Sequence, residues 1–205
     1  MVGVVDYGMG NLKSVFSAFE YIGSQVIICS HPEDLKHVDR IVIPGVGAIE
    51  QCILKLNDTG FAEALNEHVL QLAKPTMGIC LGMQVMCRVS YEGGTNLCLG
   101  WFDAEVVRLN PGQPGMKVPN IGWNKTDYNK QIPLFNGLPE APDFYYVHSY
   151  QVKTVKPEEV AASYMFGERV TASIFKDNIF ATQFHPEKSQ DFGLKILENF
   201  VKWKP

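Results

Sequence analysis

The stretch Pro75-Thr76-Met77-Gly78-Ile79-Cys80-Leu81-Gly82-Met83-Gln84 decides how this chain is expected to fold. Its first half is apolar and predicts a strand, whereas the residues after Cys80 predict a helix. The spacing Gly78-x-Cys80-x-Gly82 has the form of a nucleophile elbow, with sulfur in place of the serine oxygen. Flanking glycines let a strand and a helix approach each other closely around a strained residue. The stretch therefore predicts a sharp turn that lifts the Cys80 side chain to the end of a sheet.

Cys80 has two interpretations at this point. A cysteine that precedes a helix N-terminus has its thiolate favoured by the helix dipole, which would make Cys80 nucleophilic at neutral pH. The alternative is a buried structural cysteine, because cysteine is among the most commonly buried residue types. The remainder of the chain has to decide between these two interpretations.

The bulk composition is that of a soluble globular protein, and 205 residues suit a single domain over 1–205. A formal charge of −4 without runs of lysine or arginine argues against a nucleic-acid partner. We expect no membrane span, because no apolar stretch approaches the roughly 20 residues that cross a bilayer. The N-terminus predicts a first strand rather than a secretion signal.

The cysteines point to the redox environment. Their number, five, is odd and they form no Cys-x-x-Cys pair, which argues against a disulfide framework or a zinc site. We therefore expect a chain of the reducing cytoplasm, with no metal.

Strands and helices alternate in the first half of the sequence. Apolar runs predict strands over 1–5, 25–29 and 40–43 and a further strand that ends at Cys80. Helices are predicted over 12–22, 49–56 and 59–72, with a short helical turn over 32–35. This alternation predicts a mostly parallel central sheet that helices cover on both faces.

Glycine, proline and short β-type runs characterise the second half. Candidate strands lie over 104–109, 117–120, 143–150, 160–164, 170–175 and 178–184, and a closing helix covers 189–203. The composition marks no disordered linker, so we expect one α/β domain that carries an added antiparallel β region.

A nucleophilic cysteine needs a base, and the base needs an orienting group. His185 is the best candidate base, because Pro186 blocks extension of the strand that precedes it and Glu187 follows two residues later. Glu187 could hydrogen-bond one ring nitrogen and leave the other facing a sulfur. Among the other histidines, His148 is expected to pack within a strand, and those at 31, 37 and 68 are expected to be solvated.

Acyl transfer also needs donors for the negative charge on the attacked oxygen. The backbone N–H of Leu81 directly follows the nucleophile, and the loop Pro44-Gly45-Val46-Gly47 leaves the neighbouring strand and could supply another. No nucleotide cofactor is expected. The pair Gly8-Met9-Gly10 would need a glycine at Lys13 to complete a dinucleotide fingerprint, and a Walker lysine pattern is absent from the sequence.

Together these motifs resemble class I glutamine amidotransferases. The resemblance rests on the 44–47 loop, the 78–84 elbow, His148-Ser149-Tyr150 and His185-Pro186-Glu187, and it spans nearly the whole chain. The 6–12 segment, Gly122-Trp123-Asn124 and the 185–189 segment look most like the branch of glutaminase subunits of imidazole glycerol phosphate synthase.

The resemblance implies a fold, a reaction and a partner. The fold would be that of the family, and no cofactor would be needed. Glutamine would be hydrolysed through a cysteine thioester, and ammonia would pass to a (β/α)₈ barrel cyclase subunit within a heterodimer. That partner makes imidazole glycerol phosphate and AICAR in histidine synthesis.

The resemblance also implies site residues. Cys80 would attack, His185 would protonate the leaving ammonia and Glu187 would orient the histidine. The other implied roles are an oxyanion hole of Leu81, Gly45, Val46 and Gly47, a glutamine site of Gly47, Gln84, Ser149 and Tyr150, and a partner face of Asn11, Trp123 and Lys188. In the family, the Gly45-Val46 peptide is thought to turn only when the synthase is occupied.

One segment departs from the family pattern and keeps other functions open. Residues 97–102 hold a cysteine and two aromatics where a glycine- and leucine-rich run is expected. Similar glutaminases send ammonia to nucleotide-sugar amidation, which remains an alternative acceptor. Alternatives of another class are a cysteine peptidase or esterase, and a non-catalytic binding module.

Overall fold

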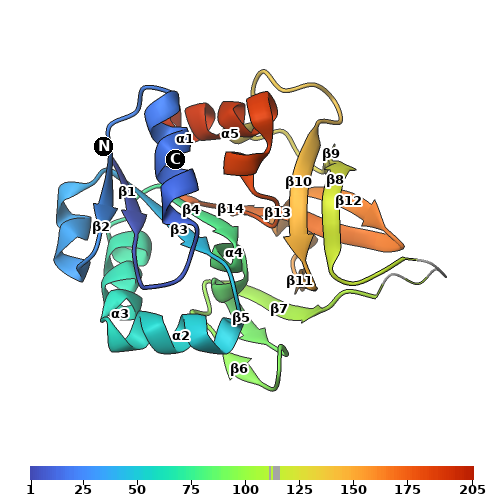
Figure 1. The fold of residues 1–205 in the computed structure, drawn as a ribbon, viewed down its shortest axis with the longest axis horizontal. Coiled ribbons are helices and arrows are strands. Elements are labelled where there is room, and N and C mark those ends of the chain that lie inside the picture. The colour runs from blue at the N-terminus through green and yellow to red at the C-terminus, as the bar shows by residue number, and fades with distance from the viewer. Residues whose placement is uncertain (111, 113–115) are drawn as a thin grey trace.

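The computed structural model describes residues 1–110, 112 and 116–205, and an eight-stranded sheet forms its centre (Figure 1). The strand order is β2-β1-β3-β4-β14-β13-β12-β9. The first five are parallel: β2 (Val26–Cys29), β1 (Val2–Val5), β3 (Arg40–Gly45), β4 (Thr76–Cys80) and β14 (Ile179–Thr182). The last three continue it antiparallel: β13 (Glu168–Lys176), β12 (Val160–Phe166) and β9 (Asp127–Tyr128).

Helices cover both faces of this sheet (Figure 1). Along β3, Val42 belongs to one buried cluster and Ile41 and Ile43 to the other, because successive side chains of a strand point to opposite faces. The Val42 cluster includes apolar residues of α1 (Leu12–Tyr21) and α5 (Gln190–Lys202). The other cluster includes those of α2 (Ile49–Asp58), α3 (Phe61–Leu65) and the π-helical turn Asn66–Gln71. The central sheet therefore has two cores, one on each face.

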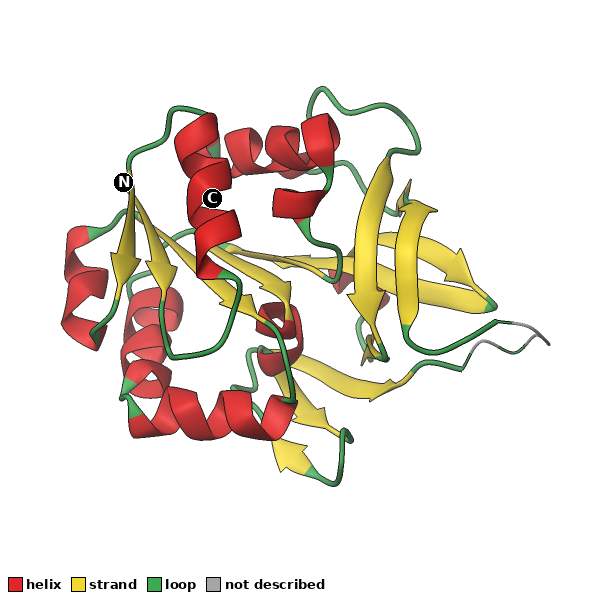
Figure 2. Cartoon of the chain, viewed as in Figure 1, coloured by secondary structure: helices red, strands yellow, loops and turns green. Residues whose placement is uncertain are grey.

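Smaller sheets stand beside the end of the parallel strands (Figure 2). One pairs β10 (Asp143–His148) with β8 (Asn120–Lys125), and the other has the order β11-β7-β5-β6. The bounds of the latter are Tyr150–Thr154, Phe102–Arg108, Cys87–Ser90 and Asn96–Leu97. Phe144 of β10 stacks on Phe184, with ring centroids 4.0 Å apart, so β10 is fixed above the end of β14.

Short helical turns complete the chain. Four 3₁₀ turns begin at prolines, namely Pro32–His37, Pro133–Phe135, Pro157–Glu159 and Pro186–Lys188. Proline suits such a start because the first helical N–H has no intrahelical partner. Within the described ranges, no helix has both the length and the apolar character that crossing a membrane requires.

The expected fold class is confirmed, but several element bounds differ. The strand expected over 117–120 instead begins at Asn120, because Pro119 has no N–H to donate to a ladder. The strand expected over 143–150 is two strands that part at Ser149 and join different sheets. The helix expected over 59–72 begins at Phe61 and becomes π-helical after Leu65. The short strands β5, β6, β9 and β11 were not expected.

Candidate active site

The turn at Cys80 has the strained geometry that its glycines predict. Strand β4 ends at Cys80, whose φ of 55° and ψ of −106° are unusual for a residue with a side chain, and α4 (Leu81–Val85) begins at the next residue. A Cβ at Gly82 would lie 1.9 Å from the Ile43 carbonyl oxygen. Only glycine therefore lets α4 begin directly against β3, and this contact fixes Cys80 at the carboxyl edge of the sheet.

His185 and Glu187 form a buried pair just after β14. The Nδ1 atom of His185 lies 2.8 Å from Oε1 of Glu187, and the two side chains are 2% and 1% exposed. A hydrogen bond of 3.0 Å from the His185 N–H to the Tyr145 carbonyl fixes the backbone. Among the described residues, Oε2 of Glu187 has no hydrogen-bond partner. The Glu187 carboxylate is therefore placed to interact with the imidazole of His185.

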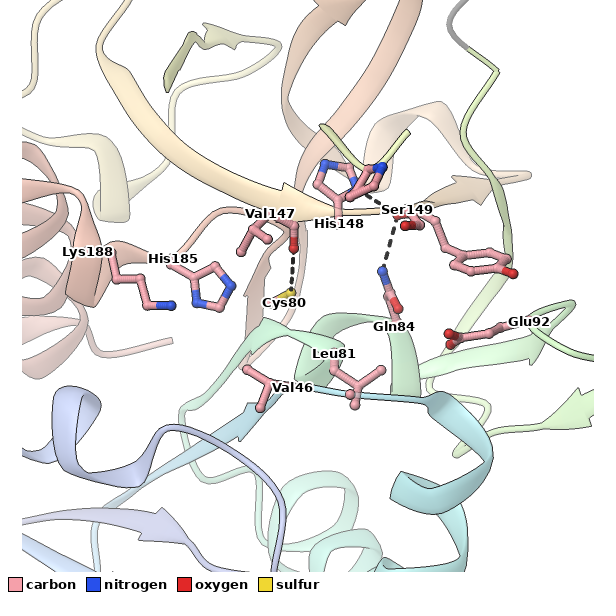
Figure 3. A pocket seen from close by; sticks show the side chains of 13 residues that line it. Val46, Cys80, Leu81, Gln84, Glu92, Val147, His148, Ser149, His185 and Lys188 are labelled. Carbon is pink, nitrogen blue, oxygen red and sulfur yellow. Dashed lines mark hydrogen bonds between the residues drawn. The ribbon is translucent and has the colours of Figure 1, made fainter. Parts of the chain in front are cut away.

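The pKa of His185 reflects this environment. Burial alone would lower the pKa, but the neighbouring Cys80 sulfur and the Glu187 carboxylate raise it from 6.5 to about 9. Nε2 of His185 is buried and makes no hydrogen bond of normal geometry within the described part of the chain. Cys80 and His185 line the same cavity of about 470 Å³ (Figure 3). The ring is therefore placed to exchange a proton with Cys80 once substrate aligns the two groups.

The expected oxyanion loop lies against the nucleophile. Val46, Gly47 and Leu81 line the cavity with Cys80, whereas Gly45 is the register partner of Cys80 in the β3–β4 ladder. Gly47 has a φ of 103°, a backbone conformation that favours glycine. The loop thus presents its backbone beside the sulfur, with the Val46 side chain 40% exposed.

A buried tyrosine supports this loop from behind. Tyr7 is 1% exposed, and its hydroxyl donates a 2.7 Å hydrogen bond to the Pro44 carbonyl. That hydroxyl would lie only 2.7 Å from a Cβ at Gly45, so glycine is required there as well. Tyr7 comes from the loop after β1. The conformation of the oxyanion loop therefore depends on a segment far from Cys80 in sequence.

The expected glutamine-binding residues also meet in this cavity. Gln84, Ser149 and Tyr150 line it together with Val46 and Leu81. Ser149 lies across the cavity from Val46 and Leu81 (Figure 3). Nε2 of Gln84 donates to the Tyr150 carbonyl at 3.2 Å, so this side chain ties α4 to the start of β11.

Two residues that the sequence analysis did not name as site residues lie beside the nucleophile or in its cavity: Glu92 lines the cavity, and Gln183 contacts Cys80. Glu92 follows β5, and its Oε2 accepts a 3.0 Å hydrogen bond from the Ile49 N–H at the start of α2 while its side chain reaches the cavity (Figure 3). Gln183 is fully buried and contacts Cys80. Gln183 lies two residues before His185, so its position near the candidate base could have drawn attention to it. Glu92 lies in a glycine-rich turn with no pattern that predicts a ligand.

The other histidines differ in part from expectation. His148 packs as expected and lines the cavity, and burial lowers its pKa to about 4. Its imidazole is therefore neutral. His68 was expected to be solvated, but it is 3% exposed because α3 and the π-helical turn pack against the sheet.

The three residues expected to face a partner lie on or beside elements that contact one another in series, namely α1, the Pro186–Lys188 turn, β10 and β8. Trp123 packs edge-on against Tyr145, with ring centroids 5.9 Å apart, and the Lys188 ammonium lies 6.0 Å from the same ring. Asn11 caps α1, accepting from the Ser14 N–H at 3.4 Å. Trp123, Lys188 and Asn11 are all exposed, so they are accessible to a second protein.

Replacing His185 with glutamine should change how stability depends on pH. Between 6.5 and about 9 the folded chain binds more protons at His185 than the unfolded chain, so the stability that His185 contributes falls as pH rises. We expect the unfolding free energy of the wild type, relative to His185→Gln, to be highest below pH 6.5 and to decline towards about pH 9. Urea unfolding across this window measures the difference, and a constant or growing difference would contradict the prediction.

Comparisons with known proteins agree with this geometry. The family model for glutamine amidotransferase class-I matches residues 3–203. The imidazole glycerol phosphate synthase subunit HisH 1 of Campylobacter jejuni (strain RM1221) is 47% identical over 202 residues, covering 98% of this chain and 100% of the relative. The imidazole glycerol phosphate synthase subunit HisH of Mesorhizobium japonicum is 39% identical over 214 residues, covering 100% and 99%.

Solved structures show the same fold. PurLQS from Thermotoga maritima matches with a TM-score of 0.75 at 18% identity, covering 98% of this chain and 97% of that one. A crystal structure of a glutamine amidotransferase matches with a TM-score of 0.74 at 18% identity, covering 98% of both chains. Full-length agreement in sequence and fold, around a cysteine elbow that faces a histidine–glutamate pair, shows that this chain belongs to the class-I glutamine amidotransferase family.

Proposed function

We propose that this chain is the glutaminase subunit of an imidazole glycerol phosphate synthase. It hydrolyses glutamine to glutamate and ammonia, and the ammonia passes to a (β/α)₈ barrel cyclase subunit that forms imidazole glycerol phosphate and AICAR. The observation that carries the proposal is the meeting of Cys80 with the His185–Glu187 pair at one cavity. The names and the 39–47% identity of the full-length relatives support this role in histidine synthesis.

The proposed reaction begins with the sulfur of Cys80. As its proton moves to His185, the sulfur attacks the carboxamide carbon and forms a tetrahedral intermediate. His185 then donates that proton to the departing nitrogen, which leaves as ammonia and yields a thioester. Water, deprotonated by His185, attacks the thioester and releases glutamate and the free thiol. Glu187 stabilises the imidazolium in both steps, as the raised pKa of His185 supports.

Backbone donors stabilise the oxyanion of both intermediates. The Leu81 N–H lies at the start of α4, and the Val46 and Gly47 peptides border the same cavity. We propose that the Gly45–Val46 peptide turns its N–H inward only when the synthase partner is occupied. The hydrogen bond from Tyr7 to Pro44 would then hold the loop from behind during this change.

The amino-acid end of glutamine is proposed to bind between Gly47, Gln84, Ser149 and Tyr150. The cavity of about 470 Å³ suits a small ligand. Glu92 adds a carboxylate to this wall, which we assign to the α-ammonium group, because an ammonium needs an ionised acceptor in a partly desolvated site.

The partner is proposed to cover the face of Asn11, Trp123 and Lys188. Trp123 is 47% exposed and Ile121 on the same strand is 62% exposed, so an apolar surface lies beside the basic Lys188. Exposed aromatic side chains of this kind commonly anchor protein interfaces. Covering this face would also place the barrel near the cavity that releases ammonia.

Two further proposals concern the cellular location of the chain and its number of domains. We propose that the chain acts in the cytoplasm, which the free thiols of Cys29, Cys52, Cys80, Cys87 and Cys98 support. Residues 1–205 are proposed to form one domain, because α5 at the end of the chain packs against α1 near its beginning.

The alternative functions are not favoured. The relatives are named as imidazole glycerol phosphate synthase subunits rather than as enzymes of nucleotide-sugar amidation. A peptidase, an esterase or a non-catalytic module would not account for membership of the amidotransferase family over 3–203.

Partner activation tests the proposed role. We expect the isolated chain to release glutamate from glutamine slowly, and the cyclase subunit with its nucleotide ligand to raise this rate strongly. Cys80→Ala should lower the rate in the complex by on the order of 10³-fold or more, since it removes the nucleophile. Cys98→Ala is the matched control and should keep the wild-type rate. Full activity of the isolated chain would contradict the proposal that the Gly45–Val46 peptide turns only when the partner is occupied. An active Cys80→Ala complex would contradict the proposed mechanism.

Replacing Glu92 with glutamine tests the ammonium site. We expect Glu92→Gln to raise KM for glutamine about tenfold to 100-fold, because a charge-assisted hydrogen bond is lost, and to change kcat little. 4-Carbamoylbutanoate lacks the amino group, so the wild type and the variant should hydrolyse it equally well. Glu50→Gln on the exposed side of α2 is the control. An equal loss on both substrates would assign Glu92 to capping α2 instead.

Trp123→Ala tests the proposed partner face. We expect the Kd for the cyclase subunit to rise by about tenfold or more, which is typical of an aromatic anchor. Titration calorimetry measures the affinity. Tyr21→Ala, which removes an aromatic side chain that is 80% exposed on α1, should leave it unchanged. Equal affinities of the wild type and Trp123→Ala would place the interface elsewhere.

A further inference from the structure

Gln183 is a buried amide in contact with the nucleophile, and the mechanism above does not use it. It is fully buried between β14 and His185, and its backbone N–H donates to the Ala172 carbonyl at 2.8 Å. Its Nε2 lies 3.6 Å from Sγ of Cys80, and its Oε1 lies 3.0 Å from Nε2 of Gln84. The side chain therefore bridges the nucleophile and helix α4.

The direction of this amide follows from a backbone carbonyl. The Tyr150 oxygen can only accept, so the Gln84 atom 3.2 Å away must be the amide nitrogen. That nitrogen also contacts Gln183, whose facing atom must then be the oxygen. The nitrogen of Gln183 consequently faces Cys80 and donates to its sulfur.

A second series of hydrogen bonds also ends at the Tyr150 carbonyl. His148 is neutral, and its Nδ1 lies 2.7 Å from the Tyr150 oxygen, so this nitrogen carries the proton. Its Nε2 accepts from the Tyr164 hydroxyl at 2.7 Å, and that hydroxyl accepts in turn from Asn120 at 2.9 Å. The donors and acceptors alternate consistently along this series of hydrogen bonds from Asn120 to Cys80. None of the side-chain amides in the series can turn over without losing a hydrogen bond.

Besides His185, two groups act on the sulfur in opposite senses. As a thiol, Cys80 donates to the Val147 carbonyl at 3.9 Å, a contact that favours the protonated form (Figure 3). The N–H of Gln183 instead favours the negative sulfur, because hydrogen bonds to the charged form stabilise it. The sulfur must become negative as it attacks, and Gln183 stays in place while Val147 loses its bond.

We propose that Gln183 is a positioning residue that holds the Cys80 sulfur and stabilises its thiolate, with its amide direction set by Gln84 and the Tyr150 carbonyl. The inference rests on the proposed role of Cys80 as the nucleophile. It assigns Gln183 an effect on the reactivity of the sulfur rather than on the binding of glutamine.

Alkylation of Cys80 by iodoacetamide tests the proposal on the full-length chain without substrate. Mass spectrometry of the peptide that contains Cys80 gives the rate from pH 6 to pH 10. We expect Gln183→Met to lower the rate at pH 7 by about tenfold, because a hydrogen bond to a charged group is lost. The loss should shrink as pH rises, because hydroxide then removes the thiol proton whether or not Gln183 donates to the sulfur. In the complex, kcat should fall and KM should stay nearly constant.

Further variants keep the test decisive. Gln84→Met frees the Gln183 amide to turn and should lower alkylation at pH 7 by a smaller factor, even if Gln183→Met folds poorly. Gln51→Met, on the exposed side of α2, is the matched control and should react as the wild type does. Wild-type alkylation rates in both Gln183→Met and Gln84→Met, or a loss that is equal at every pH, would overturn the inference. An active Cys80→Ala complex would instead overturn the proposed function, whatever the Gln183 variants do.

Discussion

The contact between Gly82 and the Ile43 carbonyl is the constraint on which the site depends. A side chain at position 82 would overlap the β3 backbone, so glycine alone lets α4 begin at the end of β4. This close approach holds Cys80 in a backbone conformation that costs roughly 1–3 kcal/mol in an unconstrained chain. The cores on both faces of the sheet stabilise that conformation, and the sulfur is thereby directed into the cavity.

Each remaining part of the site comes from the end of a different strand. The carboxyl ends of β3, β4 and β14 meet at one edge of the sheet, because parallel strands point the same way. The oxyanion loop follows β3, the nucleophile ends β4, and His185 and Glu187 follow β14. The antiparallel strand β10 then closes the cavity on another side through Val147 and His148, and Ser149 directly after the strand also lines it. The parallel sheet thus positions the chemistry, and the added β region encloses it.

The charged and titratable groups in the cavity favour movement of a proton between the Cys80 sulfur and the His185 imidazole. Glu187 is buried beside His185 and favours the imidazolium, whereas burial lowers the pKa of His148 to about 4. The pKa values of the two histidines in one cavity are therefore shifted in opposite directions. The difference arises because only His185 has a buried carboxylate as its partner.

Local patterns in the sequence are enough to predict the elbow, the alternation of strands and helices, and a cysteine, a histidine and a glutamate in suitable local settings. Glycine spacing and apolar periodicity are local properties, so they can be interpreted without coordinates. Only the tertiary structure decided that Glu92 reaches the cavity and that Gln183 faces the sulfur. The break of the expected 143–150 strand at Ser149 was likewise decided there, since its two halves pair with different sheets. These features depend on contacts between residues as much as about 100 positions apart, such as Cys80 and Gln183, which no local pattern records.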